Sequence, residues 1–168
     1  MGREIERKFL PAHDQWSAEK FIRQAQLTQG YLVENEQWIL RVRLMEQSMP
    51  QAARRGFLTL KGNPPDQLGP AWHGHAEFEY PIPPEDAQQL LATTNLKLQK
   101  ERRWIEFAGQ VFEVDIFTSG LVLIELELAD PAQKIIAPPW LGPEVTGDVR
   151  YTNRYLAEHE AGKELVKA

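Results

Sequence analysis

Residues 110–128 read QVFEVDIFTSGLVLIELEL, and charged and apolar side chains alternate on both sides of the short Thr-Ser-Gly link. In a β-strand, residues i and i+2 lie on the same face. Glu113 and Asp115 therefore share one face before the link, and Glu125 and Glu127 share one face after it. A link this short joins antiparallel strands, because parallel strands need a longer crossover. The stretch predicts a hairpin with one charged face and one largely apolar face.

The same alternation recurs along the chain and indicates a mainly β (α+β) protein. It predicts eight strands, at residues 2–9, 27–33, 37–45, 57–62, 75–82, 96–107, 110–117 and 121–128. Three helices are predicted, in the run that follows Pro83, at residues 15–25 and at residues 152–159. Residues 46–56 and 62–74 contain Pro and Gly and are predicted to be long surface loops. We expect one domain that covers residues 1–168.

Composition and charge restrict the function. The 168 residues include 19 Lys and Arg against 24 Asp and Glu, and a net charge of −5 is unfavourable for wrapping nucleic acid. The chain has no Cys, which excludes disulfides, thiol nucleophiles and zinc sites that need sulfur, and which fits the reducing cytoplasm. No apolar run approaches the ~18 residues of a membrane span. We therefore expect a cytoplasmic protein with neither a nucleic acid nor a membrane as its partner.

The charged positions of the predicted strands are mostly like-charged pairs at i and i+2. Such a face on a single strand is commonly the solvated side of a sheet. Recurrence over seven strands favours another interpretation, because like charges this close repel unless a counter-charge or a ligand lies between them. The cations are Lys8, Arg41, Arg43, Lys61, Lys100 and Arg102, and the carboxylates are Glu4, Glu6, Glu77, Glu79, Glu113, Asp115, Glu125 and Glu127.

A sheet that closes with this face inward would form a wet tunnel, because burying an unpaired charge costs several kcal/mol. Eight strands leave room inside for one small ligand. Converging Arg and Lys side chains suit phosphoryl oxygens, and clustered carboxylates suit a hard divalent cation such as Mg²⁺ or Mn²⁺. A polyphosphate with a metal ion satisfies both sets of charges.

The chain also resembles a known family. Its residues 4–8, EIERK, resemble the N-terminal E-x-E-x-K signature of the CYTH superfamily, also called triphosphate tunnel metalloenzymes. Further matching segments follow in order: Gln29-Gly30-Tyr31-Leu32, Arg41-Val42-Arg43, Thr59-Leu60-Lys61, Glu77-Phe78-Glu79, Lys100 with Arg102, Glu113-Val114-Asp115, Glu125-Leu126-Glu127-Leu128 and Glu144 to Tyr151. The resemblance implies an eight-stranded antiparallel tunnel that holds a triphosphate, as in the short bacterial members that act on inorganic triphosphate.

Roles for individual residues follow from this resemblance and from the physics of phosphoryl transfer, in which positioning and charge neutralisation do most of the work. The six cations are expected to bind the phosphates. The expected metal ligands are Glu4, Glu6, Glu125 and Glu127, with Glu113 and Asp115 assisting, while Glu77 and Glu79 orient the water or bind metal. Lys8, expected to be crowded by other cations, pairs with Tyr31 for proton transfer.

The sequence thus predicts metal-dependent hydrolysis of a small-molecule triphosphate, with inorganic triphosphate as the expected substrate. Two alternatives remain open. A class IV adenylyl cyclase would convert ATP to cyclic AMP and pyrophosphate and would need a base pocket, which the strand pattern does not identify. A non-catalytic module would bind polyphosphate without turnover. The sequence also leaves open whether the protein forms a homodimer.

Overall fold

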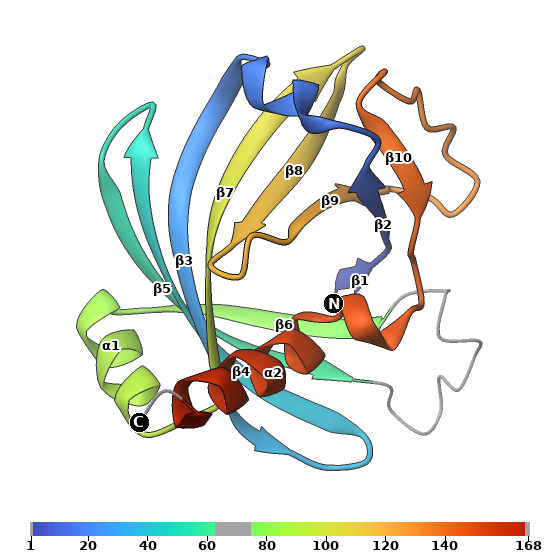
Figure 1. Ribbon diagram of the computed structural model, residues 1–168. Coiled ribbons are helices and arrows are strands. Elements are labelled where there is room, and N and C mark those ends of the chain that lie inside the picture. Colours follow the sequence, from blue (N-terminus) through green and yellow to red (C-terminus); the bar gives the residue numbers. More distant parts are fainter. Residues whose placement is uncertain (1, 63–74, 167–168) are drawn as a thin grey trace.

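The computed structural model describes residues 2–62 and 75–166, with side chains at 5–62 and 76–159. This part of the chain forms ten strands and two α-helices (Figure 1). The strands are β1 (Gly2–Glu4), β2 (Glu6–Pro11), β3 (Phe21–Glu34), β4 (Trp38–Met49), β5 (Ala53–Gly62), β6 (His75–Ile82), β7 (Lys97–Phe107), β8 (Gln110–Phe117), β9 (Val122–Glu127) and β10 (Leu141–Glu144). The helices are α1 (Pro84–Ala92) and α2 (Asn153–Val166), and 3-10 turns lie at Asp14–Ala18 and Val149–Tyr151.

All ten strands belong to one antiparallel sheet, in the order β1-β6-β5-β4-β3-β7-β8-β9-β2-β10. No ladder of hydrogen bonds joins the two edge strands in the described part of the chain. The N-terminal segment nevertheless brings the two ends together, because β1 pairs with β6, β2 pairs with β9, and only Ile5 separates β1 from β2. The sheet therefore curves around an interior, in the manner of a tunnel.

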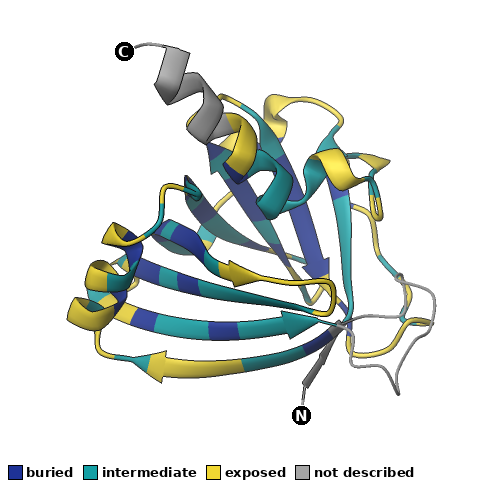
Figure 2. Ribbon diagram, turned by 90° about the horizontal axis from the view of Figure 1, so that it is seen from below, coloured by how far each residue is buried: buried dark blue, intermediate teal, exposed yellow. Residues whose placement is uncertain are grey.

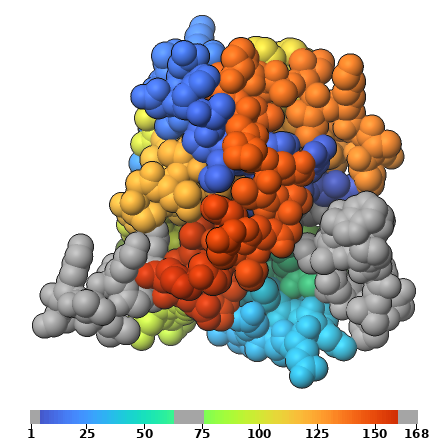
Figure 3. Space-filling view, turned by 45° about the vertical axis from the view of Figure 1, so that its right-hand side comes forward, coloured from blue at the N-terminus to red at the C-terminus, as the bar shows by residue number. Residues whose placement is uncertain are grey.

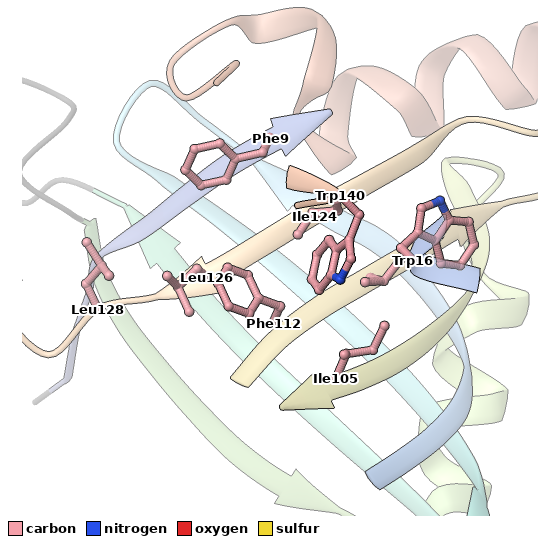
Figure 4. Packing of buried hydrophobic residues seen from close by; sticks show 9 residues of the cluster. Phe9, Trp16, Ile105, Phe112, Ile124, Leu126, Leu128 and Trp140 are labelled. Atoms are coloured by element: carbon pink, nitrogen blue, oxygen red, sulfur yellow. The ribbon is translucent and has the colours of Figure 1, made fainter. Parts of the chain in front are cut away.

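Apolar side chains cover the convex face of this sheet. Phe9, Phe112, Ile124, Leu126 and Trp140 come from β2, β8, β9 and the segment before β10 and pack together in the largest core cluster (Figure 4). A second cluster lies where α1 covers the convex face of β3 to β5, and its buried residues are Val42, Leu44, Ala87 and Leu91. Buried positions lie along the strands, and exposed ones gather at turns and on the outer sides of helices (Figure 2). Hydrophobic burial outside thus leaves the middle of the concave face to the charged residues, with a smaller apolar cluster on either side of them.

The predicted mainly β architecture is confirmed, with two strands more than expected. Segment 2–9 is divided at Ile5, because the chain changes its pairing partner there from β6 to β9. The further strand is β10, which pairs with β2. The helices after Pro83 and near residue 152 are confirmed, and the Tyr155 N–H donates to Thr152 Oγ1 at 3.2 Å, as a cap should.

Two local predictions are wrong. Residues 15–25 are not a helix: a 3-10 turn ends at Ala18, and β3 begins at Phe21, where pairing with β7 overrides the local helix preference. Residues 46–56 are not a loop, because β4 and β5 continue to pair as far as Gln47 and Ala53. The predicted loop 62–74 lies almost wholly outside the described residues. Within the described residues, no helix is long and apolar enough to cross a membrane.

Candidate active site

A cavity of about 350 Å³ lies in the interior of the sheet. Every side chain that lines it is charged or an amide. The lining residues are Glu6, Gln29, Arg41, Arg43, Lys61, Glu77, Glu79, Lys100, Arg102, Glu113, Glu125, Glu127 and Asn153. Strand alternation brings all of these residues together except Asn153 of α2, since each pair at i and i+2 points to the concave face.

Eleven of the residues singled out from the sequence therefore meet in one cavity. Asp115 lies just beneath it, fully buried under Lys100 and Arg102. Lys8 and Tyr31 line an adjoining outer cavity instead. Glu4 belongs to β1, but its side chain lies outside the described residues.

Arg102 is the centre of the ion-pair network on one wall. Its Nε and Nη2 donate to the two carboxylate oxygens of Asp115 at 2.6 and 2.7 Å, and Nη2 also donates to Glu125 Oε2 at 2.7 Å. Nη1 pairs with Glu113, and the neighbouring Lys100 ammonium donates to Asp115 as well. One guanidinium thus holds three carboxylates of β8 and β9, of which Asp115 is fully buried and Glu125 nearly so.

These contacts shift the ionisation of the buried groups. Burial alone would raise the pKa of Glu125, but Lys8, Lys100 and Arg102 outweigh it and hold the pKa well below its usual range. Burial lowers the pKa of Lys100, and the charge of Arg102 adds to this effect against the opposing charge of Asp115. The lysine whose charged form is disfavoured is therefore Lys100.

The surroundings of Lys8 differ from the expectation that cations crowd it. Its Nζ lies 2.5 Å from Glu125 Oε1 and 2.9 Å from Glu6 Oε1. Burial disfavours the ammonium, but the two carboxylates outweigh it and raise the Lys8 pKa above its usual value. Burial likewise raises the pKa of Tyr31 to about 12, although Arg41 and a hydrogen bond from Gln29 oppose the shift. Both groups hold their protons at neutral pH, and each raised pKa makes the group a weaker acid than the free side chain.

The opposite wall is formed by β4, β5 and β6. Arg41 Nη2 donates to Glu77 Oε1 at 3.3 Å, and Arg43 Nη2 donates to Glu79 Oε2 at 2.8 Å. In the same ladder, Lys61 pairs in register with Glu77, and both side chains line the cavity. The Nε atoms of Arg41 and Arg43 are buried and have no hydrogen-bond partner. Two guanidiniums of this wall thus keep donors available for an acceptor.

The donor set of the cavity fits a hard divalent cation, because it offers carboxylate oxygens and neither sulfur nor imidazole. Glu6 faces Glu127 directly in the β2–β9 ladder, and Glu113 faces Glu125 in the β8–β9 ladder. Like charges placed opposite one another are destabilising without a cation between them. Among the described side chains, however, no three carboxylates or imidazoles already converge in a metal-binding group. A metal ion would therefore share these carboxylates with Lys8 and Arg102.

Three residues of the site were not predicted from the sequence. Gln29 donates to Tyr31 Oη at 3.0 Å, and its place two residues before Tyr31 could have indicated that it points inward. Thr59 accepts from Arg41 Nη2 at 3.3 Å, donates to Glu79 at 3.0 Å and lies two residues before Lys61. Asn153 accepts from Lys100 Nζ at 3.2 Å but comes from α2, to which no strand alternation applies.

The outer cavity, of about 430 Å³, shares Glu6, Arg41, Lys61 and Asn153 with the central one. It lies between the hairpin that joins β3 to β4 and the start of α2. Figure 3 shows this side, where the C-terminal segment (orange to red) crosses between the N-terminal residues (blue) and that hairpin (light blue). Trp38, Ile39 and Tyr31 give it walls that are less polar than those of the central cavity.

Acid should weaken the fold through Glu125. The folded pKa of Glu125 is depressed, so its stabilising effect is complete above the ordinary glutamate pKa of 4.5 and is lost as the pH falls from there through the folded pKa. For this group the free energy of unfolding should fall by up to about 1.4 kcal/mol per pH unit. Urea unfolding at pH 6, 4 and 3 should show the stability gap between wild type and Glu125→Gln narrowing with acid. Glu106→Gln, an exposed change on β7, should show no such narrowing.

Comparisons with known proteins agree with this geometry. The model of the CYTH domain family matches residues 2–155. The inorganic triphosphatase of Acetivibrio thermocellus is 33% identical over 164 residues, which is 95% of this chain and 96% of that protein. The inorganic triphosphatase of Nitrosomonas europaea is 35% identical over 161 residues, 92% of this chain and 96% of that protein.

A solved structure shows the same fold in a distant sequence. The conserved hypothetical protein from Pyrococcus furiosus superposes with a TM-score of 0.54 at 16% identity and covers 98% of this chain and 88% of that one. The family match covers nearly the whole chain, and both triphosphatases exceed 30% identity over almost their full lengths. This chain therefore belongs to the CYTH domain family.

Proposed function

We propose that this protein hydrolyses inorganic triphosphate to pyrophosphate and orthophosphate with the help of a divalent cation. The observation that carries the proposal is the cavity wall in which the buried Nε donors of Arg41 and Arg43 have no partner. A buried donor without an acceptor is costly, and phosphoryl oxygens supply acceptors of the right charge. Burial and the adjacent Arg41 also lower the pKa of Arg43, an effect that a bound anion would offset. The two relatives named inorganic triphosphatase support the same substrate.

The charge balance of the cavity supports a metal ion together with the polyanion. Five cations and six carboxylates line it, so the site by itself is not electropositive. A triphosphate alone would be repelled by the carboxylates, and a metal ion alone by the cations. A polyanion and a dication bound together would satisfy both sets.

The residues have distinct parts in the proposed reaction. Arg41, Arg43 and Lys61 on one wall and Lys100 and Arg102 on the other would hold the phosphates and neutralise the charge that develops on them. Water would add to a terminal phosphorus while the bond to the bridging oxygen breaks, and pyrophosphate would leave. The metal would be held by Glu6 and Glu127, with Glu4, Glu113 and Glu125 beside them and Asp115 behind, and it would supply Lewis-acid charge. We assign Glu77 and Glu79 to orienting Arg41 and Arg43 or the water.

An organic triphosphate is the second candidate substrate, because the outer cavity adjoins the phosphate-binding cations and has a partly apolar wall. A base or another ring could lie against Trp38 and Ile39 there. The cavity does not favour this over inorganic triphosphate, since Asn35 Oδ1, one of its amide oxygens, already accepts from the backbone N–H groups of Gln37 and Trp38.

Tripolyphosphate should be hydrolysed with a kcat/KM at least about tenfold above that for ATP, a difference of roughly 1.4 kcal/mol. The assay measures phosphate, pyrophosphate and cyclic AMP with each substrate in Mg²⁺ or Mn²⁺. EDTA should abolish turnover, and added Mg²⁺ or Mn²⁺ should restore it. Cyclic AMP as the main product from ATP would assign a cyclase, and saturable binding without turnover would assign a binding module.

A further inference from the structure

The interior of the sheet is not charged along its whole length. Ala25, Leu27 and Met45 are buried on the concave face and pack with Phe57 and Trp104; we call these five residues the end cluster. Strand register places the cluster there, because Leu27 lies beside Lys100 in the β3–β7 ladder and beside Met45 in the β3–β4 ladder. None of these five described side chains lines the central cavity, which ends at Arg43 and Arg102 on this side.

Aromatic rings separate the cavity from what lies behind the end cluster. The Arg43 guanidinium lies 5.3 Å from the Phe57 ring centre, and that of Arg102 lies 5.8 Å from the ring of Trp104. A third guanidinium, of Arg23, lies 4.3 Å from the same Trp104 ring. The indole of Trp104 is fixed by a hydrogen bond from Nε1 to Glu113 at 2.8 Å. Trp104 thus lies between a cation of the cavity and a cation behind the cluster.

Behind the end cluster lie two arginines, Arg23 and Arg55, that have no carboxylate within ion-pair distance among the described side chains. Arg23 donates to Gln47 Oε1 at 2.7 Å and to Met45 Sδ at 3.3 Å. Arg55 lies on β5, directly opposite Met45 in the β4–β5 ladder. In addition to burial, the charge of Arg55 lowers the pKa of Arg23, and the charge of Glu113 opposes this effect. The two guanidiniums therefore repel each other.

The other end of the cavity disfavours additional phosphates for a different reason. There the central cavity opens into the outer one, where Trp38 and Ile39 present apolar surface and Glu34 and Glu36 present carboxylates. Arg154 is paired with Glu34 at 2.6 Å, so its charge is already neutralised. Beyond the cations that it shares with the central cavity, this space offers a phosphate only Lys8 and Arg154 among the described residues, and both are already paired with carboxylates.

We propose that the end cluster closes one end of the substrate cavity and, with the outer cavity at the other end, limits the bound chain to three phosphates. The proposal rests on the proposed function and adds the residues that select chain length. A fourth phosphate at the closed end would be forced against the side chains of Leu27, Met45 and Trp104, which carry no positive charge themselves and separate it from Arg23. Shortening the end cluster would open a way to Arg23 and Arg55, which would then bind the additional phosphate.

The test compares linear tripolyphosphate with linear tetrapolyphosphate on each protein preparation. We expect wild type to prefer tripolyphosphate by at least about tenfold in kcat/KM, because uncompensated charge is poorly tolerated in a buried site. Leu27→Ala/Met45→Ala should reduce this preference at least about threefold, and adding Arg55→Gln should restore it. Because the test uses the ratio of the two kcat/KM values measured on one preparation, a loss of folded protein cancels out. If the double variant does not fold, Met45→Ala alone is used for the test.

Met49→Ala is the matched control, because it removes an exposed methionine from the same strand and should leave the ratio unchanged. Equal use of both substrates by wild type would overturn the proposal, as would an unchanged ratio in a folded opened variant. If wild type hydrolyses neither anion, the proposed function fails instead. The preference for three phosphates is then tested by binding: tripolyphosphate should raise the melting temperature of wild type more than tetrapolyphosphate does, and the opened variant should reduce this difference.

Discussion

Arg102→Ala should reduce the free energy of unfolding by at least about 3–5 kcal/mol, the loss typical of breaking a buried ion pair from one side. The guanidinium contacts Asp115, Glu125 and Glu113, and the first two are buried. Without it, Asp115 keeps only the Lys100 ammonium as a cationic contact in the described structure. Arg102→Lys should recover only part of the loss, because an ammonium cannot span three carboxylates. Urea unfolding at pH 7 measures both variants.

The control is the next residue along the strand. Arg103 points to the convex face and, among the described residues, forms one ion pair, to Glu101 at 2.6 Å, beside the rings of Trp16 and Phe21. Arg103→Ala should therefore cost only about 1 kcal/mol. Equal losses at the two neighbouring positions would contradict the central place given to Arg102.

Alternation in the sequence was sufficient to tell which residues face inward. Glu113 and Asp115 could be assigned to one face because a strand has a strict period of two, and the same holds for Arg41 and Arg43. The environment of each residue depends on register between strands far apart in the chain, which a local pattern does not contain. This is why Lys8 could be placed inside while its carboxylate neighbours, which come from β2 and β9, could not be foreseen.

The limits of the fold prediction have the same origin. The end cluster occupies concave-face positions, but no local pattern distinguishes Leu27 and Met45 from residues of a convex-face core or shows that they meet Trp104. Asn153 reaches the cavity only because α2 returns to β7 after the last strand. Contacts made by tertiary packing between distant elements therefore account for what the sequence did not predict.

Arg41→Ala should lower kcat/KM for tripolyphosphate by about 10²–10³, the usual effect of removing one preorganised donor from a phosphoryl or oxyanion site. The side chain carries one of the two buried Nε donors without a partner and lines both cavities. Its loss also leaves Glu77 and Glu79 with less positive charge beside them, which adds repulsion toward the substrate. The rise in melting temperature that tripolyphosphate produces in wild type should shrink in parallel, because the anion stabilises only the state that binds it.

Arg54→Ala separates this effect from a general loss of positive charge. Arg54 lies on the neighbouring strand β5 but contacts Glu46, Glu85 and Gln88 away from the cavity. The same change of charge should therefore leave kcat/KM within about twofold of wild type and leave the melting-temperature rise intact. Were binding governed by the overall charge of the protein, the two variants would behave alike and both effects would disappear in ~1 M salt, where the screening length is only about 3 Å. A large loss confined to Arg41→Ala, which persists at moderate salt, would instead require a direct contact between this guanidinium and a phosphate inside the cavity.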